Sequence, residues 1–238
     1  GGRFRFLVNG VEIMAKGIKK IKWAGEDAHS VITNMSIANK LVTIHGDKLA
    51  YFKVGEWFPG TTEADKKKNV TWMWLNKESD IIIRQKTLAH NFIYGVRVKK
   101  KFCGPYTYNL DASITGAPSG LKEIGLKFRG YCQASIVSSA WSISHGGDDA
   151  RKTYVFSYGH IINLHLDTEG INGDLVTIEI YNLQTGTDRK IDSYPKIPVV
   201  DGQINLEIKN TSTWRAKLRF TTEEEKFYIK VIANGKYV

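Results

Sequence analysis

The stretch "YGHIINLHLDTEGINGDLVTIEIYN", residues 158–182, combines two histidines and several acidic residues with a run of Gly and Asn. Apolar and polar residues alternate on both sides of residues 169–174, whose glycines and Asn-Gly pair favour a turn. A period of two is typical of half-buried strands. We therefore expect a β-hairpin in which His165, Asp167 and Glu179 face water, rather than a catalytic or metal-binding cluster.

The same alternation continues along the chain, and turn residues separate the apolar segments at short intervals. Many short strands with regular turns are typical of an all-β sandwich or barrel. One polar segment, residues 62–68, suggests at most one or two helical turns in a loop. Two segments that flank Asn9-Gly10 should form an N-terminal hairpin. The other expected strands are residues 41–45, 70–75, 81–84, 92–98, 106–114, 126–131, 136–142, 153–158, 204–208, 215–220 and 227–232.

Three pairs of similar segments occur in the same order in the two halves of the chain. The segment "IKKIKWAGEDA" with Trp23 matches "IVSSAWSISHGGDD" with Trp141, and "VTWMWLN" from Val70 matches "VTIEIYN". The segment "GPYTYNLDASITG" matches "EKFYIKVIANGKY", which aligns Tyr108 with Tyr228. These matches indicate a diverged duplication of a unit of about 100 residues, the size of an Ig-like sandwich. Chance similarity between strand-rich segments is the alternative.

The domain boundary is expected near residues 115–125, where Gly, Pro and Ser cluster. The segment that follows alternates well enough to pair back onto residues 106–114 as a closing hairpin. We therefore expect two tandem Ig-like β-sandwich domains, one over residues 18–132 and one over residues 133–238. Residues 1–17 would form an N-terminal hairpin or the edge of a preceding element.

The chain contains two cysteines, Cys103 and Cys132. A hairpin centred on residues 117–118 would place them opposite each other, which makes them a candidate disulfide at the end of the first domain. The apolar faces favour a register shifted by one residue, with Tyr108 opposite Phe128, and one β-bulge would reconcile the two registers. The alternative is a pair of buried thiols, which behave as small hydrophobic groups. A disulfide would favour an exported protein.

The chain of 238 residues is basic, with 34 Lys and Arg against 24 Asp and Glu and a formal net charge of +10. Such a surplus can signal nucleic acid, an anionic surface or an acidic partner. The densest runs, residues 66–68 and 99–101, are short, so we expect solvated lysines and no nucleic-acid partner. No apolar run is long enough for a helix to span a bilayer. The chain begins with Gly-Gly, which we expect of a tag remnant or of a piece of a longer protein.

The sequence contains no GxSxG, HExxH, Walker A or GxGxxG motif. We therefore expect no catalytic residue, no metal site and no cofactor. His145, Asp148 and Asp149, in the loop "SHGGDDARK", are the best remaining candidates for a divalent cation site. Trp57 and Trp214 lie next to turns, where an exposed ring could stack on a sugar or, alternatively, close the end of a sandwich.

Several of these segments resemble parts of a known group of proteins. The segments "VTWMWLN", "CGPYTYNLDASITG", "GYCQASIVSSAWS" and "EEKFYIKVIANGKY" resemble the tandem Ig-like β-sandwich repeats of large exported proteins from Bacteroidota. Some of those proteins resemble cargo linked to type VI secretion or related contractile injection systems. The resemblance covers most of residues 18–238 and implies a non-enzymatic structural module. It transfers no catalytic residue to this chain.

The sequence therefore predicts a non-enzymatic spacer or docking module of a larger, secreted or exported bacterial protein. Its partners would be other domains of the same chain or a secretion-apparatus protein, with cell-envelope glycan as a further partner. One alternative is a carbohydrate-binding β-sandwich that uses Trp57 or Trp214. Another is a basic secreted toxin or nuclease with its catalytic residues around His145, Asp148 and Asp149.

Overall fold

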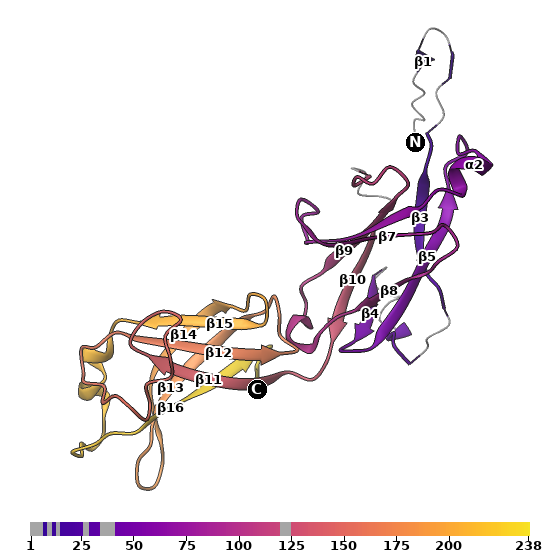
Figure 1. Cartoon of the computed structure of the whole chain (residues 1–238). Helices are drawn as coiled ribbons and strands as arrows, with labels where there is room; N and C mark the ends of the chain where they lie inside the picture. The colour runs from indigo at the N-terminus through magenta and orange to yellow at the C-terminus, as the bar shows by residue number, and fades with distance from the viewer. Residues whose placement is uncertain (1–6, 9–10, 13–14, 26–28, 34–40, 120–124) are drawn as a thin grey trace. The chain divides into compact units, whose positions relative to one another are not determined.

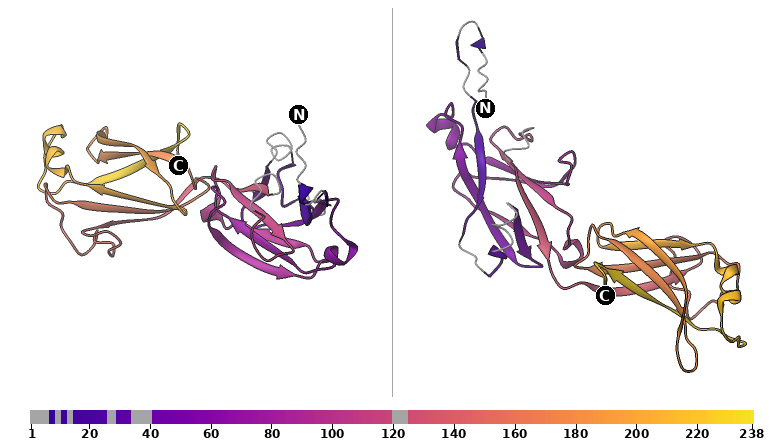
Figure 2. Two further views of the ribbon diagram at one scale, coloured as in Figure 1. Left: turned by 90° about the horizontal axis from the view of Figure 1, so that it is seen from above. Right: turned by 180° about the vertical axis from the view of Figure 1, so that it is seen from behind.

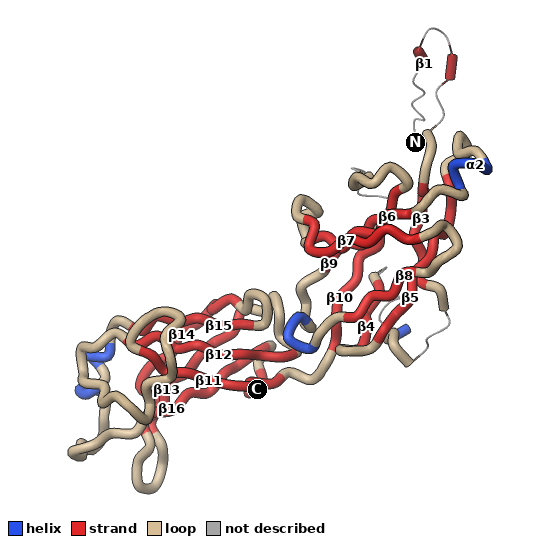
Figure 3. Tube along the Cα trace, in the orientation of Figure 1, coloured by secondary structure: helices blue, strands red, loops and turns tan. Residues whose placement is uncertain are grey.

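The computed structural model describes residues 7–8, 11–12, 15–25, 29–33, 41–119 and 125–238 (Figure 1). The chain divides into two compact units, of which the first contains residues 1–98 and 107–129 and the second contains residues 99–106 and 130–238. The fold is all-β, which confirms the class predicted from the alternation, and the helical segments are short (Figure 3). Within the described ranges, no helix is long and apolar enough to cross a membrane.

The first unit contains two antiparallel sheets and a small N-terminal hairpin. Strands β1 (Leu7–Val8) and β2 (Val11–Glu12) form the expected hairpin, although Asn9 and Gly10 lie outside the described residues. A five-stranded sheet has the order β4 (Val42–His45), β10 (Leu126–Tyr131), β9 (Tyr108–Ser113), β6 (Val70–Leu75) and β7 (Ile82–Leu88). A three-stranded sheet has the order β3 (Ile18–Trp23), β5 (Leu49–Trp57) and β8 (Tyr94–Arg97).

Aromatic side chains fill the space between the two sheets of the first unit. Trp72 of β6 stacks on Tyr94 of β8, with the ring centroids 5.3 Å apart and the planes 5° apart. The same face of β6 carries Trp74, which packs edge-on against Tyr108 and Phe128. Because β6 and β8 belong to different sheets, the two sheets pack face to face around these rings.

The helical segment expected at residues 62–68 is a single turn, α2 (Glu63–Lys66). The hydroxyl of Thr62 caps this turn by accepting a hydrogen bond from the backbone N–H of Asp65 at 3.1 Å. Lys66 pairs with Glu63 and Lys68 pairs with Asp65, so two of the three lysines in this basic run are neutralised locally.

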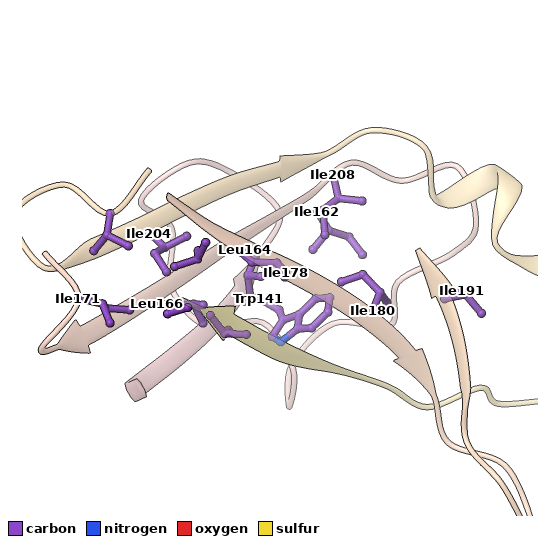
Figure 4. Close-up of a cluster of buried hydrophobic side chains, with 14 of the residues drawn as sticks. Trp141, Ile162, Leu164, Leu166, Ile171, Ile178, Ile180, Ile191, Ile204 and Ile208 are labelled. Carbon is purple, nitrogen blue, oxygen red and sulfur yellow. The ribbon is translucent and has the colours of Figure 1, made fainter. Parts of the chain in front are cut away.

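The second unit also contains two antiparallel sheets (Figure 2). The first has the order β11 (Ser135–Ser142), β12 (Ile162–Glu169) and β15 (Gln203–Ile208). The second has the order β14 (Arg189–Pro198), β13 (Leu175–Asn182), β16 (Phe227–Ala233) and β17 (Lys236–Tyr237). Side chains from both sheets meet in one apolar core around Trp141, Leu164 and Ile178 (Figure 4).

The stretch from residue 158 to residue 182 contains both strands that were expected, but they do not form a hairpin. Strand β12 pairs with β11 and β15, whereas β13 pairs with β14 and β16 in the other sheet. The turn between them, with Gly170 and Gly173 at φ values of 77° and 90°, carries the chain from one sheet to the other. The hairpin prediction was wrong because the same turn residues suit both connections, and the pairing partners are distant in sequence.

Both units have the same strand order once β1, β2 and β4 of the first unit are set aside. Among the remaining strands of each unit, the first, second and fifth form one sheet: β3-β5-β8 in the first unit and β11-β12-β15 in the second. The other sheet is β7-β6-β9-β10 in the first unit and β14-β13-β16-β17 in the second, and the first unit adds β4 beside β10. The three sequence matches join β3 to β11, β6 to β13 and β9 to β16, which are equivalent strands in this order.

Segment 99–106 belongs to the second unit although it lies between two strands of the first. Its backbone bonds to the turn between β12 and β13: Asn172 N donates to Cys103 O at 2.9 Å, and Tyr106 N donates to Asn172 O at 3.1 Å. Glycines permit this close packing, because a Cβ at Gly104 would lie 2.3 Å from Asn172 N, and one at Gly202 would lie 2.3 Å from Lys101 O. The second unit therefore differs from the expected range of residues 133–238.

The sequence left open whether Cys103 and Cys132 form a disulfide or remain thiols, and in the structure both side chains are thiols. Both residues belong to the second unit rather than to the end of the first. Cys103 Sγ donates to Lys99 O at 3.6 Å, and Cys132 Sγ donates to Lys100 O at 3.7 Å. The register with Tyr108 opposite Phe128, which the apolar faces favoured, is the one that β9 and β10 adopt.

Two expected strands are absent, and two long observed strands were missed. Residues 153–158 form a loop, and residues 215–220 begin with a 3-10 helix, η3 (Arg215–Lys217). Strands β5 and β14 were not predicted. Strand β14 is mostly exposed and contains Pro195 and Pro198, a composition that suits an edge strand but weakens its sequence signal.

Candidate functional site

The histidine and acid of β12 lie on the outer face of their sheet, as predicted. His165 Nδ1 lies 2.8 Å from Asn205 Oδ1, and His165 Nε2 lies 3.3 Å from Asp167 Oδ1. Ser138 Oγ donates to the other carboxylate oxygen of Asp167 at 2.6 Å, and this bond lowers the pKa of Asp167. The group forms a cross-strand polar ladder on β11, β12 and β15 that stabilises the sheet surface.

Glu179 is buried, which contradicts the prediction that it is solvated. Its carboxylate accepts hydrogen bonds from Lys190 Nζ at 3.0 Å, Tyr181 OH at 2.9 Å and Tyr237 OH at 3.3 Å. Burial alone would raise the pKa of Glu179, but the bonds from Lys190 and Tyr181 outweigh it and lower that pKa. Alternation placed the residue correctly on the outer face of β13, but it could not show that tyrosines cover this face.

Trp214 is only 2% exposed and is not a ring on the protein surface. Its Nε1 donates to Asp192 Oδ2 at 3.0 Å, and that carboxylate oxygen also accepts from Tyr194 OH and Asn210 Nδ2, each at 2.9 Å. Burial raises the pKa of Asp192, but the hydrogen bonds from Trp214 and Tyr194 outweigh it, so the pKa is lowered. Trp57, at the end of β5 in the other unit, is partly buried and pairs with Ile18.

His145, Asp148 and Asp149 are exposed, and the structure does not assemble them into a metal site. Arg151 holds Asp149 through Nε at 2.9 Å from both carboxylate oxygens, which lowers the pKa of Asp149 to about 2. Asp149 Oδ1 also accepts from the backbone N–H of Trp141 at 3.2 Å. In the part of the chain that the structure describes, no three His, Cys, Asp or Glu residues form a metal-binding group.

A cavity of the second unit lies between two long connections. One connection joins β11 to β12 and the other joins β15 to β16, and together they line a cavity of about 1170 Å³. Thr211 links them, because its Oγ1 donates to His160 O at 2.7 Å and accepts from Gly159 N at 2.9 Å. The aromatic residues of the lining are Trp141, Tyr154, Phe156, Tyr158, Trp214 and Phe227.

The aromatic rings of the cavity form two contact groups. Tyr158 meets Phe227 edge-on at 6.4 Å, and Phe227 in turn lies 5.1 Å from Trp214. Tyr154 packs edge-on against Phe156 at 5.2 Å. The pKa of Tyr158 is raised, chiefly by burial and then by the nearby Glu225 carboxylate. Sequence reasoning missed this cavity because it assigned residues 153–158 and 215–220, which contribute to its lining, to strands.

No protein-family model and no curated protein matches the chain. Among solved structures, a marsupial T cell receptor is similar to it at 13% sequence identity, and the match covers 82% of this chain and 67% of the receptor chain with a TM-score of 0.26.

Proposed function

We propose that the chain is a non-enzymatic module of two tandem Ig-like β-sandwiches that acts as a spacer or docking element of a larger exported bacterial protein. The observation that carries this proposal is the strand order common to both units. Two antiparallel sheets packed around one core are the architecture of Ig-like domains. Tandem copies of such a unit extend a protein without a new core architecture, which suits a spacer.

The use of the carboxylates supports a structural function. Glu179 and Asp192 each accept hydrogen bonds from three neighbouring side chains. Asp167 is held by Ser138 and His165 on the surface of one sheet. A general acid or base must exchange a proton with a bound substrate. These carboxylates are instead used for cross-strand stabilisation.

The resemblance to exported Bacteroidota repeats supports the remaining parts of the proposal. It favours type VI secretion cargo as the class of parent protein. It also favours other domains of that chain, or a protein of the secretion apparatus, as partners. The surplus of positive charge, +10 over the chain, gives such contacts an electrostatic component.

Deletion and replacement in the parent protein test this function. Residues 18–238 are deleted from the full reading frame, and in a second variant they are replaced by an unrelated pair of β-sandwich domains of the same length. A spacer predicts that deletion abolishes delivery and that the replacement restores it. A docking element predicts that the replacement does not restore delivery. In both cases the purified parent protein without residues 18–238 should keep its own activity.

The proposal fails if delivery is unchanged by the deletion. It also fails if the chain of 238 residues alone hydrolyses nucleic acid or peptidoglycan and this hydrolysis is abolished by His145→Ala or Asp149→Ala. The latter result would favour the toxin or nuclease alternative.

A further inference from the structure

We propose that the cavity of the second unit binds a neutral oligosaccharide, with Tyr154 and Tyr158 as the principal contacts. This binding function goes beyond a spacer or docking function, because it assigns a ligand class to a site within one unit. The inference rests on the size of the cavity, the balance of its charges and the placement of its aromatic rings.

The size of the cavity favours a ligand of several linked units. Its volume of about 1170 Å³ lies above the range of about 300–1,000 Å³ that is usual for pockets for small molecules. The two hydrogen bonds of Thr211 fix the connections that form its walls. Because Thr211 is itself buried, water does not compete for these bonds. They therefore hold the two connections in a defined position beside the cavity.

The charges of the lining favour a neutral ligand. Three cationic residues, Arg151, Arg215 and Lys226, and three acidic residues, Glu223, Glu224 and Glu225, line the cavity. The formal charges of the lining therefore balance. An anionic ligand such as a phosphate would require a surplus of cations, and a basic peptide would require a surplus of acids.

The aromatic rings distinguish a saccharide from other neutral ligands. Tyr154 and Tyr158, which line the cavity, are 41% and 38% exposed, whereas Trp141 and Trp214 of the same lining are buried. A sugar ring presents C–H groups on its faces, which pack against the electron-rich face of an aromatic ring. Its hydroxyl groups can bond to the carboxylates and guanidinium of the rim. The lining combines these rings with charged and hydroxyl groups in nearly equal measure, which suits a saccharide better than a lipid chain that cannot hydrogen-bond to them.

Binding is tested with the whole chain on an array of neutral linear oligosaccharides, and the best ligand is then titrated by calorimetry. Tyr158→Ala should weaken binding by at least about tenfold, which corresponds to 1.4 kcal/mol. Tyr158→Phe keeps the ring and should retain most of the affinity. Tyr131→Ala is the matched control, because it removes a half-exposed tyrosine of the same unit outside the cavity. Circular dichroism of each variant checks that the fold is intact.

Three results would overturn the proposal. The first is that no neutral oligosaccharide binds to the wild-type chain. The second is that Tyr158→Ala and Arg215→Gln, both folded, bind as well as the wild type. The third is that only anionic glycans bind and that 0.5 M salt, roughly, abolishes the binding, since this would indicate non-specific attraction to the basic surface. None of these results bears on the delivery experiment, so the two proposals fail separately.

Discussion

Tyr108 of β9 and Phe227 of β16 are equivalent residues of the two units. Tyr108 lies two residues before Leu110, which pairs with Trp74, and Phe227 lies two residues before Ile229, which pairs with Ile180. Tyr108 packs against the rings of Trp74 and Phe128, and Phe227 packs against Trp214. An aromatic side chain therefore occupies the same inward position in both sandwiches.

This equivalence corrects the sequence match by one residue. The match aligned Tyr108 with Tyr228, but Tyr228 points to the outer face, where it pairs with Tyr181 and stacks on it at 5.4 Å. A shift of one residue moves a side chain to the opposite face of a sheet. The equivalent strands could thus be found from the sequence, while their exact alignment needed the registers of β9 and β16.

Gly202→Ala should destabilise the second unit by about 3 kcal/mol or more. Gly202 has a φ of 73°, and an added Cβ would lie 2.3 Å from Lys101 O, so backbone strain and a clash with segment 99–106 act together. Gly186→Ala is the control, because Gly186 has a φ of 95° but nothing within 4 Å of the added Cβ. Urea unfolding followed by tryptophan fluorescence measures both variants. Equal losses would show that the clash is relieved at little cost.

Asp192→Ala should destabilise the second unit by about 3 kcal/mol, because it leaves Trp214 Nε1 and Asn210 Nδ2 without this acceptor in a largely buried site. Asp148→Ala removes an exposed carboxylate and should change stability by no more than about 0.5 kcal/mol. Calorimetric melting of both variants gives the comparison. A melting temperature of Asp192→Ala equal to that of the wild type would mean that other groups satisfy Trp214.

Glu179→Ala should cost about 1–3 kcal/mol, because the hydroxyls of Tyr181 and Tyr237 lose a buried acceptor. Glu207→Ala is the matched control, since Glu207 pairs with Lys209 in an exposed ion pair that should contribute less than about 1 kcal/mol. Denaturant midpoints of the two variants separate the cases. If both variants lose equally little stability, the hydrogen bonds from Tyr181 and Tyr237 to Glu179 do not contribute to stability in solution.

Asp149→Asn should change the acid dependence of stability rather than the fold. The pKa of Asp149 is lowered to about 2 by Arg151, so the carboxylate stabilises the folded state above its ordinary pKa of about 4. That stabilisation is lost as the pH falls through about 2, and the variant lacks it at every pH. Because the pair is exposed, the difference at pH 6 should be below about 1 kcal/mol. Unfolding curves between pH 6 and pH 2 should therefore converge; a constant difference would contradict the assignment.

A strand was predictable from the sequence where one face of its sheet is buried and the other is exposed to solvent. Strand β12 has this pattern at every residue, and its alternation was evident. Strand β14 was missed because it is an edge strand with charged residues and prolines, which need no periodic apolar face. Residues 153–158 were assigned to a strand because their aromatics alternate, but no neighbouring strand pairs with them, and the rings pack around the cavity instead.

The candidate site was less predictable, because it depends on contacts between segments distant in sequence. Thr211 and His160 are about fifty residues apart, and no local pattern indicates that they meet. Trp214 was considered as an exposed ring next to a turn, but it is buried and bonded to Asp192, a residue of the missed strand β14. The balance between cationic and acidic residues in the lining could not be predicted either, because it depends on both connections lining the same cavity.

The assignment of residues 99–106 to the second unit has a consequence for synthesis of the chain. A ribosome delivers this segment before residues 107–129 of the first unit and well before β12, whose following turn it packs against. Domains usually complete folding in order from the N-terminus during translation. Here the first unit combines strands from both sides of segment 99–106. The partners of that segment belong to the second unit and are synthesised later. We therefore expect Phe102 and Cys103 to lack their final packing until the turn at Asn172 and the residues around Gly202 have been synthesised.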